Sequence, residues 1–270
     1  MTDATLPGAV VDALVCPVCR QRLRRSGSSL RCLAGHTFDI ARQGYVNLLA
    51  GNARTGTADT AAMVADRAAF LSGGHYAPLA ELVAEWAAGW APGLVVDAGA
   101  GVGYYLGAVL DRRPDSVGLA LDLSPLALRR AARAHDRIGA AVWDVWQPWP
   151  VRDHAAAVLV NVFAPRNGAE FHRVLRPDGT LVVVTPTAAH LAELGAGMLN
   201  VDPRKDERLA ATLAGFEPVA RQRLEYPLAL SAEDVRRVVG MGPAAFHDRP
   251  PPETGSRQVT ASFQVTAYRA

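Results

Sequence analysis

Features that would direct this chain to a membrane or out of the cell are scarce or missing. Cysteine occurs three times in 270 residues, which is too few for a disulfide framework. No stretch reaches the roughly 18 uninterrupted apolar residues that a membrane span needs. The N-terminus lacks the basic start, long apolar run and small-residue cleavage site of a secretory signal. These absences predict a cytoplasmic protein without a membrane anchor.

A large excess of charge is missing as well. The formal net charge is +2, so any contact with nucleic acid must come from a local patch. Half of the chain is apolar, which is enough for a sizeable buried core. The length predicts one full-sized domain, 51–270, plus a small N-terminal module, 1–50, with 51–90 as a helical connection.

Beyond residue 90 the chain alternates regularly between predicted strands and helices. Short runs rich in Val and Leu predict strands at 94–98, 117–124, 140–145, 155–163 and 180–186. The segments between them, at 101–112, 125–135 and 168–175, and a further segment at 190–199, have helical spacing. Doubly apolar strands separated by helices indicate a parallel sheet covered on both faces. Residues 217–230 and 259–268 alternate like antiparallel strands around a helix at 232–239. The expected fold is α/β, a seven-stranded Rossmann-like sheet of the class I methyltransferase type.

A glycine-rich turn follows the first of these strands. Gly99, Gly101 and Gly103 let the backbone turn sharply and approach a ligand closely. A dinucleotide-binding turn has the spacing G-x-G-x-x-G and holds a pyrophosphate. Here the spacing is G-x-G-x-G, and Asp97 comes just before it. This carboxylate would repel a pyrophosphate but attract the ammonium group of S-adenosylmethionine.

Two further acids follow at the ends of the next two strands. Asp122 ends the second strand, where a carboxylate can accept hydrogen bonds from both ribose hydroxyls. Asp144 ends the third strand, within reach of an adenine amino group. The three acids favour an S-adenosylmethionine site that also includes Tyr104, Leu123 and Val145. A tight turn beside solvated acids and a nicotinamide enzyme are the alternatives.

The cysteines and one histidine form a metal-binding pattern near the N-terminus. Cys16 and Cys19 make a CxxC knuckle, and Cys32 and His36 follow as CxxxH. Three thiolates and one imidazole can close a tetrahedron around Zn²⁺ and leave no open position, as in structural sites. Because a segment this short buries too little apolar surface to fold alone, the metal would supply its folding free energy. Three buried thiols and a surface histidine are the alternative.

The loop between the two knuckles is strongly basic. Residues 20–31 contain no acid, and their basic residues are Arg20, Arg22, Arg24, Arg25 and Arg31. Held on a rigid loop, these arginines form a credible phosphate-contacting patch. A solvated face that serves only solubility is the alternative.

Together these motifs resemble the bacterial 23S rRNA (guanine-N1)-methyltransferase family, which includes macrolide-resistance enzymes of the tylosin type. The resemblance extends over nearly the whole chain. It is carried by the two zinc knuckles and by the segments QGYVNLL (43–49), NVFAPRN (161–167) and VGMGP (239–243).

The resemblance implies methyl transfer from S-adenosylmethionine to N1 of a guanine in the hairpin loop of helix 35 of 23S rRNA, near the macrolide exit tunnel. It also implies zinc in the N-terminal module and a homodimer. Asn161, Phe163 and Pro165, after the fourth strand, are then the residues beside the reacting base. Asn161 could hold the Watson–Crick edge of a flipped guanine, and Phe163 could stack on it. Core packing is the alternative for Phe163.

Guanine N1 carries a proton, so the reaction also needs a proton acceptor. No carboxylate lies in 161–165, and Asp144, His75 and Tyr76 are the eligible groups elsewhere. Two other classes of function share part of the pattern. A methyltransferase acting on a small molecule would share the glycine turn and the acids without needing an arginine-bearing zinc module. A non-catalytic RNA-binding assembly factor would share the zinc module but would not bind S-adenosylmethionine.

Overall fold

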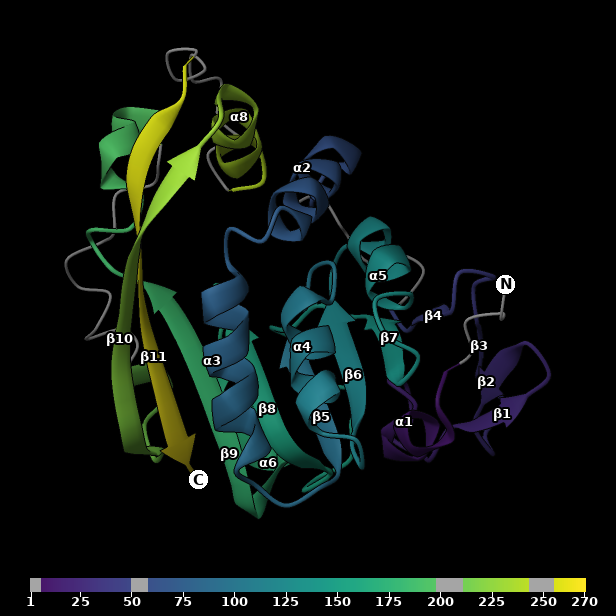
Figure 1. The fold of residues 1–270 in the computed structure, drawn as a ribbon. Helices are drawn as coiled ribbons and strands as arrows, with labels where there is room; N and C mark the ends of the chain where they lie inside the picture. The colour runs from purple at the N-terminus through teal and green to yellow at the C-terminus, as the bar shows by residue number, and fades with distance from the viewer. Residues whose placement is uncertain (1–5, 50–57, 198–210, 243–254) are drawn as a thin grey trace.

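The computed structural model describes residues 6–49, 58–197, 211–242 and 255–270. Its main element is an eight-stranded sheet with the strand order β10-β11-β9-β8-β5-β6-β7-β4 (Figure 1). The strands of this sheet are β4 (Tyr45–Asn47), β5 (Leu94–Ala98), β6 (Val117–Asp122), β7 (Ile138–Val142), β8 (Ala156–Val162), β9 (Leu175–Pro186), β10 (Glu217–Leu230) and β11 (Arg257–Arg269).

The six strands from β4 to β9 are parallel, and β11 and β10 close the sheet as antiparallel strands. The carboxyl ends of the parallel strands therefore share one edge of the sheet. In open α/β sheets this edge is where ligands bind. The predicted acids, at the ends of β5 and β6 and just after β7, thus lie along the same edge.

The expected count of seven strands was wrong, although the seven strands that the sequence indicates, β5 to β11, are confirmed. The eighth strand is β4, which pairs in parallel with β7 through Tyr45 and Ala140, Val46 and Ala141, and Asn47 and Val142. Of its three residues only Val46 is buried. A strand this short at a sheet edge produces no apolar run, so periodicity could not reveal it.

Helices cover both faces of the parallel sheet. They are α1 (Gly8–Ala13), α2 (Ala61–Ser72), α3 (Ala77–Ala88), α4 (Tyr104–Arg112), α5 (Pro125–Ala131), α6 (Gly168–Val174) and α8 (Ala232–Gly240), with a 3₁₀ helix η1 (Ala192–Gly197). Successive strand residues alternate between two apolar cores. Val95 packs in the core under α3 and α4, whereas Val96 packs in the core with α1 and α6. Strands β5, β7 and β8 are buried along their whole length for this reason.

Local chemistry fixes where several helices begin. The Thr60, Ser124 and Ser231 hydroxyls accept hydrogen bonds from the backbone of the first turns of α2, α5 and α8. Helix α4 begins at Tyr104 rather than at the predicted residue 101, because Gly101 and Gly103 have left-handed φ. The helix expected at 190–199 is the 3₁₀ helix η1 as far as residue 197, with Gly195 at φ 62°, and residues 198 and 199 lie outside the described residues.

The N-terminal segment folds as a three-stranded antiparallel sheet of β1 (Arg24–Ser26), β2 (Ser29–Arg31) and β3 (Thr37–Asp39). This small sheet lies beside the β4 edge of the large one (Figure 1). Leu14, Leu23 and Leu30 belong to the same apolar core as Leu119 of β6. At the other side of the molecule, α2 packs against α8 beyond the upper ends of the strands. No helix among the described residues has both the length and the apolarity to cross a membrane.

Candidate functional site

The predicted metal ligands converge at one point of the small N-terminal sheet. The ligand atoms of Cys16, Cys19, Cys32 and His36 all lie within 4.8 Å of one another. The Sγ atoms of Cys19 and Cys32 are 3.7 Å apart, and His36 Nδ1 lies 3.5 Å from Cys16 Sγ and 3.3 Å from Cys32 Sγ. A tetrahedron with Zn–S of about 2.3 Å and Zn–N of about 2.0 Å has edges of roughly 3.5–3.8 Å. The four side chains therefore fit a structural zinc ion.

Tight backbone turns bring these ligands together. The N–H of Cys16 donates to Gln21 O and the N–H of Arg20 donates to Cys16 O, each at 2.8 Å. In the second knuckle, the N–H of Gly35 donates to Cys32 O at 3.0 Å, with Gly35 at φ 91°. Because the unfolded chain holds no such arrangement, zinc binding and folding of this segment are coupled.

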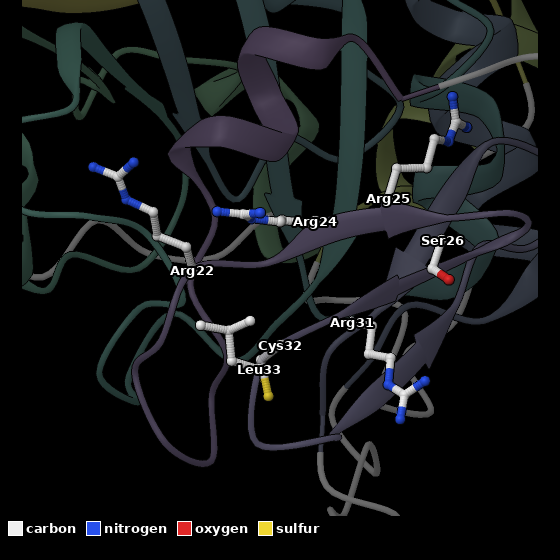
Figure 2. A pocket seen from close by; sticks show the side chains of 7 residues that line it. All are labelled: Arg22, Arg24, Arg25, Ser26, Arg31, Cys32 and Leu33. Carbon is white, nitrogen blue, oxygen red and sulfur yellow. The ribbon is translucent and has the colours of Figure 1, made fainter.

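The arginines of this segment divide into two groups. The guanidinium of Arg20 donates to the carbonyls of Trp149, at 2.6 Å, and Val151, so this side chain joins the zinc segment to the large sheet. The other four are exposed and form no ion pair within the described residues: Arg22, Arg24, Arg25 and Arg31. They line a shallow depression of about 300 Å³ (Figure 2). The predicted patch of five arginines thus contains four that are available for an anion.

At the carboxyl edge of the large sheet, the glycine turn is shaped by close contacts. Gly99 has φ 80°, and a Cβ there would lie 2.4 Å from Ala164 Cβ. Gly103 also has φ 80°, and a Cβ there would lie 2.9 Å from the Cα of Ala131. Larger residues would be strained at both positions. The turn therefore presses directly against the segment that follows β8.

Asp97, at the end of β5, is only 2% exposed. No hydrogen bond or ion pair reaches its carboxylate from the described residues. Burial, together with the nearby charge of Asp122, raises its pKa to about 8. A buried carboxylate without a partner is costly, and an ammonium group would remove that cost. This cradle fits the amino-acid end of S-adenosylmethionine.

The other predicted cofactor residues lie around the same edge. The Asp122 carboxylate accepts hydrogen bonds from Gly101 N and Ser124 N, both at 2.8 Å. Burial raises the pKa of Asp122, and the hydrogen bonds from these two N–H groups lower it, with burial the larger effect. Asp144 lies two residues beyond the end of β7, and its Oδ1 accepts from Trp146 N at 3.0 Å. Leu123 and Tyr104 are half-buried, and Val145 is buried.

Of the three residues predicted to lie on the substrate side, Phe163 and Pro165 lie in the segment that follows β8, whereas Asn161, expected after the strand, is the penultimate residue of β8 itself. Asn161 is fully buried, and its Nδ2 donates to the carbonyls of Ala98, at 3.0 Å, and Pro165, at 2.9 Å. The Oδ1 atom of Asn161 is buried and has no partner among the described residues. Pro165 itself is exposed. Asn161 therefore ties the segment to β5 and leaves one unused acceptor.

The position of Phe163 is compatible with both roles considered for its ring, core packing and stacking on a base. Its backbone has φ 55°, and the side chain is 40% exposed. Its ring lies 5.5 Å from that of Phe263 and stacks on His190 at 6.3 Å with a 20° interplanar angle. One part of the ring packs in an aromatic cluster while the rest faces solvent. Such a ring can receive a base.

Sequence reasoning missed two residues near this cluster. Tyr105 has a buried hydroxyl with no partner among the described residues, and its ring contacts Phe163 at 6.3 Å. His190 accepts from Ser262 N at 3.2 Å through Nδ1, and its Nε2 lies 3.1 Å from the Tyr76 hydroxyl. His75, a residue eligible as proton acceptor, instead pairs with Asp234 at 3.4 Å. Because these contacts join distant segments, no local motif could have signalled them.

Comparison with known proteins finds relatives of the zinc-binding segment and of the chain as a whole. Residues 14–55 match the zinc-ribbon family described as RlmA, N-terminal. A Streptomyces fradiae protein named 23S rRNA (guanine(748)-N(1))-methyltransferase is 52% identical over 274 residues, covering 96% of this chain and 98% of that protein. A Micromonospora griseorubida protein with the provisional name 23S rRNA (guanine-N(1)-)-methyltransferase is 51% identical, covering 95% and 97%. The solved structure of MccD protein shares the fold, with a TM-score of 0.50, 12% identity and coverage of 71% and 97%.

The zinc site predicts a stoichiometric, structural metal. We expect the purified protein to contain about one zinc ion per chain and Cys32→Ser to lose it, because a tetrahedral site needs all four ligands. Loss of the metal should lower the melting temperature by several degrees, since zinc binding contributes to folding. Elemental analysis and thermal unfolding measure both effects, and Thr37→Ser, beside His36, is the control. A Cys32→Ser protein with full zinc content would contradict the ligand set.

The burial of the Asp97 carboxylate predicts that the free energy of unfolding depends on pH in an unusual way. The folded Asp97 pKa of about 8 exceeds the ordinary value of 3.8, so the folded chain holds a proton that the unfolded chain releases. The stability of the unliganded protein should therefore fall as pH rises from about 4 to about 8. Asp97→Asn should remove this loss and be more stable at pH 8, on the order of several kcal/mol. The same variant should lose binding of S-adenosylhomocysteine.

Urea unfolding at several pH values and calorimetric binding test this prediction. Asp178→Asn, at an exposed carboxylate, is the matched control and should change neither quantity. An Asp97→Asn variant that is less stable than the parent at pH 8 would show that the carboxylate is paired.

Proposed function

Because the chain belongs to the family of bacterial 23S rRNA (guanine-N1)-methyltransferases, we propose that it transfers a methyl group from S-adenosylmethionine to N1 of a guanine in 23S rRNA. One observation carries the proposal: the glycine turn after β5 presses against the segment that presents Phe163. A base stacked on Phe163 would lie beside the methyl donor, and methyl transfer requires such an in-line approach. We further propose that the target lies in the helix 35 hairpin loop.

The cofactor supplies an electrophilic methyl group on its sulfonium when bound. Asp97 pairs with its ammonium group, and Asp122 accepts hydrogen bonds from the ribose hydroxyls through the lone pairs that Gly101 and Ser124 leave unused. Asp144 and Val145, after β7, lie along the adenine. Leu123 and Tyr104 complete the walls of this pocket.

On the substrate side, Phe163 stacks on the guanine once the base has left its stack. The unused Oδ1 of Asn161 accepts a hydrogen bond from the N2 amino group of guanine. N1 stays open to the methyl group, and its proton passes to water as the bond from N1 to the methyl carbon forms and the bond from that carbon to sulfur breaks. The Pro165 carbonyl holds the Asn161 amide in this orientation. Positioning by these residues supplies a large part of the rate enhancement that such a reaction needs.

Residues 1–50 act in this proposal as the zinc-binding RNA-recognition module and residues 51–270 as the methyltransferase domain. Four exposed arginines of the module contact phosphates (Figure 2). The Arg20 contacts with the carbonyls of Trp149 and Val151 hold the module against the segment that follows β7. An rRNA substrate places the enzyme in the cytoplasm, where a homodimer would present two such surfaces. In a producing or exposed cell the modification would confer macrolide resistance.

The proposal is tested by methyl transfer from labelled S-adenosylmethionine to 23S rRNA that lacks the modification. We expect incorporation and a primer-extension stop within the helix 35 loop, because methylation at N1 blocks base pairing. Asp97→Ala should abolish both signals, whereas Asp178→Ala should retain them. If the zinc-loaded protein binds the cofactor without methylating this RNA, a small-molecule substrate becomes the better assignment.

The arginine patch predicts how RNA binding depends on salt. Arg24→Ala combined with Arg25→Ala removes two phosphate contacts, so the slope of log K against log salt should fall by about 1.5–2. The affinity for a helix 35 hairpin should drop roughly tenfold at physiological salt. Arg112→Ala combined with Arg221→Ala, two exposed arginines outside the module, is the control. Identical salt slopes for the two double variants would remove the patch from the RNA interface.

A further inference from the structure

Arg67, in the middle of α2, reaches across to the glycine turn. A Cβ on Gly101 would lie 3.5 Å from Arg67 Nη1 and 3.7 Å from Arg67 Cδ. The guanidinium charge also acts on Asp122, whose pKa it lowers against the effect of burial. The side chain is 25% exposed. A cation that belongs to a distant helix therefore covers the outer side of the cofactor turn.

Two contacts within the protein hold this guanidinium in place. Arg67 Nη1 forms an ion pair with Asp59, and Arg67 Nη2 donates to the carbonyl of Met241 at 2.7 Å. Met241 follows α8, so this bond joins α2 to the end of α8. A guanidinium has five N–H donors in a fixed plane, and two of them serve these contacts. Within the part of the chain that the structure describes, the other three donors are left for a further anion.

The backbone of the turn offers an anion little by itself. Gly99 N and Ala100 N both donate to Leu121 O, and Gly103 N donates to Ala100 O. Gly101 N donates to the Asp122 carboxylate. These N–H groups are used within the fold, in contrast to a phosphate-binding turn, whose N–H groups face the ligand. A side-chain donor would therefore add to the few N–H groups that the turn leaves for a negatively charged group.

The amino-acid end of S-adenosylmethionine carries two charges, an ammonium and a carboxylate. Asp97 can pair only with the ammonium, and a nearby acid such as Asp122 repels the carboxylate. We propose that Arg67 binds the carboxylate of the cofactor, so that the zwitterion lies between Asp97 and Arg67 across the glycine turn. This inference rests on the proposed function. Planar guanidinium–carboxylate pairs are strong and directional, as such a clamp requires.

The alternative role for Arg67 is a purely structural tie between α2 and the end of α8. A pair of ligands separates the two roles. S-adenosylhomocysteine carries both the ammonium and the carboxylate. Its decarboxylated analogue, 5′-(3-aminopropylthio)-5′-deoxyadenosine, keeps the ammonium and lacks the carboxylate. If Arg67 is only a structural tie, its removal changes the affinity for both ligands equally. If Arg67 binds the carboxylate, its removal weakens only the binding of S-adenosylhomocysteine.

The experiment is titration calorimetry of both ligands with the zinc-loaded full chain and with Arg67→Ala. We expect Arg67→Ala to weaken S-adenosylhomocysteine about 50-fold and to leave the decarboxylated analogue within about twofold of the parent. Arg237→Ala is the matched control, because Arg237 is a cation of α8 that pairs with Glu233 and Asp234. It should change neither affinity.

Equal weakening of both ligands by Arg67→Ala, or no weakening of either, would overturn the inference. If the parent protein binds neither ligand, the cofactor assignment of the proposed function fails instead, so the two failures are distinguishable. Should Arg67→Ala not fold, Asp59→Asn serves in its place, since it frees the Arg67 guanidinium from its internal partner. That variant should then bind S-adenosylhomocysteine several-fold more tightly and the analogue unchanged. An unaltered ratio of the two affinities would contradict the clamp.

Discussion

The constraint on which the site depends is a buried carboxylate, at the end of the central strand, that has no partner among the described residues. Asp97 lies between β6 and β8, under a glycine turn that admits no side chain at Gly99. Its raised pKa shows that the fold keeps this group where its charge is unfavourable. A cationic ligand group would remove this cost, so stability and the proposed function are opposed at this position.

One segment contacts both the zinc module and the segment that presents Phe163. Residues 143–151, after β7, carry Asp144 and Val145, the residues proposed to lie along the adenine. The Val145 carbonyl accepts a hydrogen bond from Asn167 Nδ2, in the segment that presents Phe163, and the Trp149 carbonyl accepts one from Arg20 of the zinc module. These two hydrogen bonds link the zinc module and the segment after β8 to the same stretch of chain. A zinc ion held by the four ligands would fix the turn that carries Arg20.

Much of the fold was predictable because its signals are local. The apolar runs of β5 to β9 report strands buried on both faces, and the alternation in 217–230 and 259–268 reports the antiparallel edge. The spacing of Cys16, Cys19, Cys32 and His36 fits a tetrahedron, and the structure brings the four together. β4 escaped prediction because a three-residue edge strand gains its pairing only from β7. The start of α4 was misplaced because left-handed glycines, rather than periodicity, decide where that helix begins.

The sequence by itself determined the order of strands from β5 to β11, the zinc ligands and the acids at the strand ends, since each depends on spacing along one segment. Tertiary structure alone decided which atoms in the site are still unpaired. In the folded chain, Arg20 donates to the carbonyl of Trp149 and Asn161 Nδ2 donates to the carbonyl of Ala98. The Arg67 side chain lies against Gly101. These outcomes depend on contacts between segments far apart in the chain. Whether a polar group is available to a ligand is decided by its neighbours in space, and sequence spacing does not specify them.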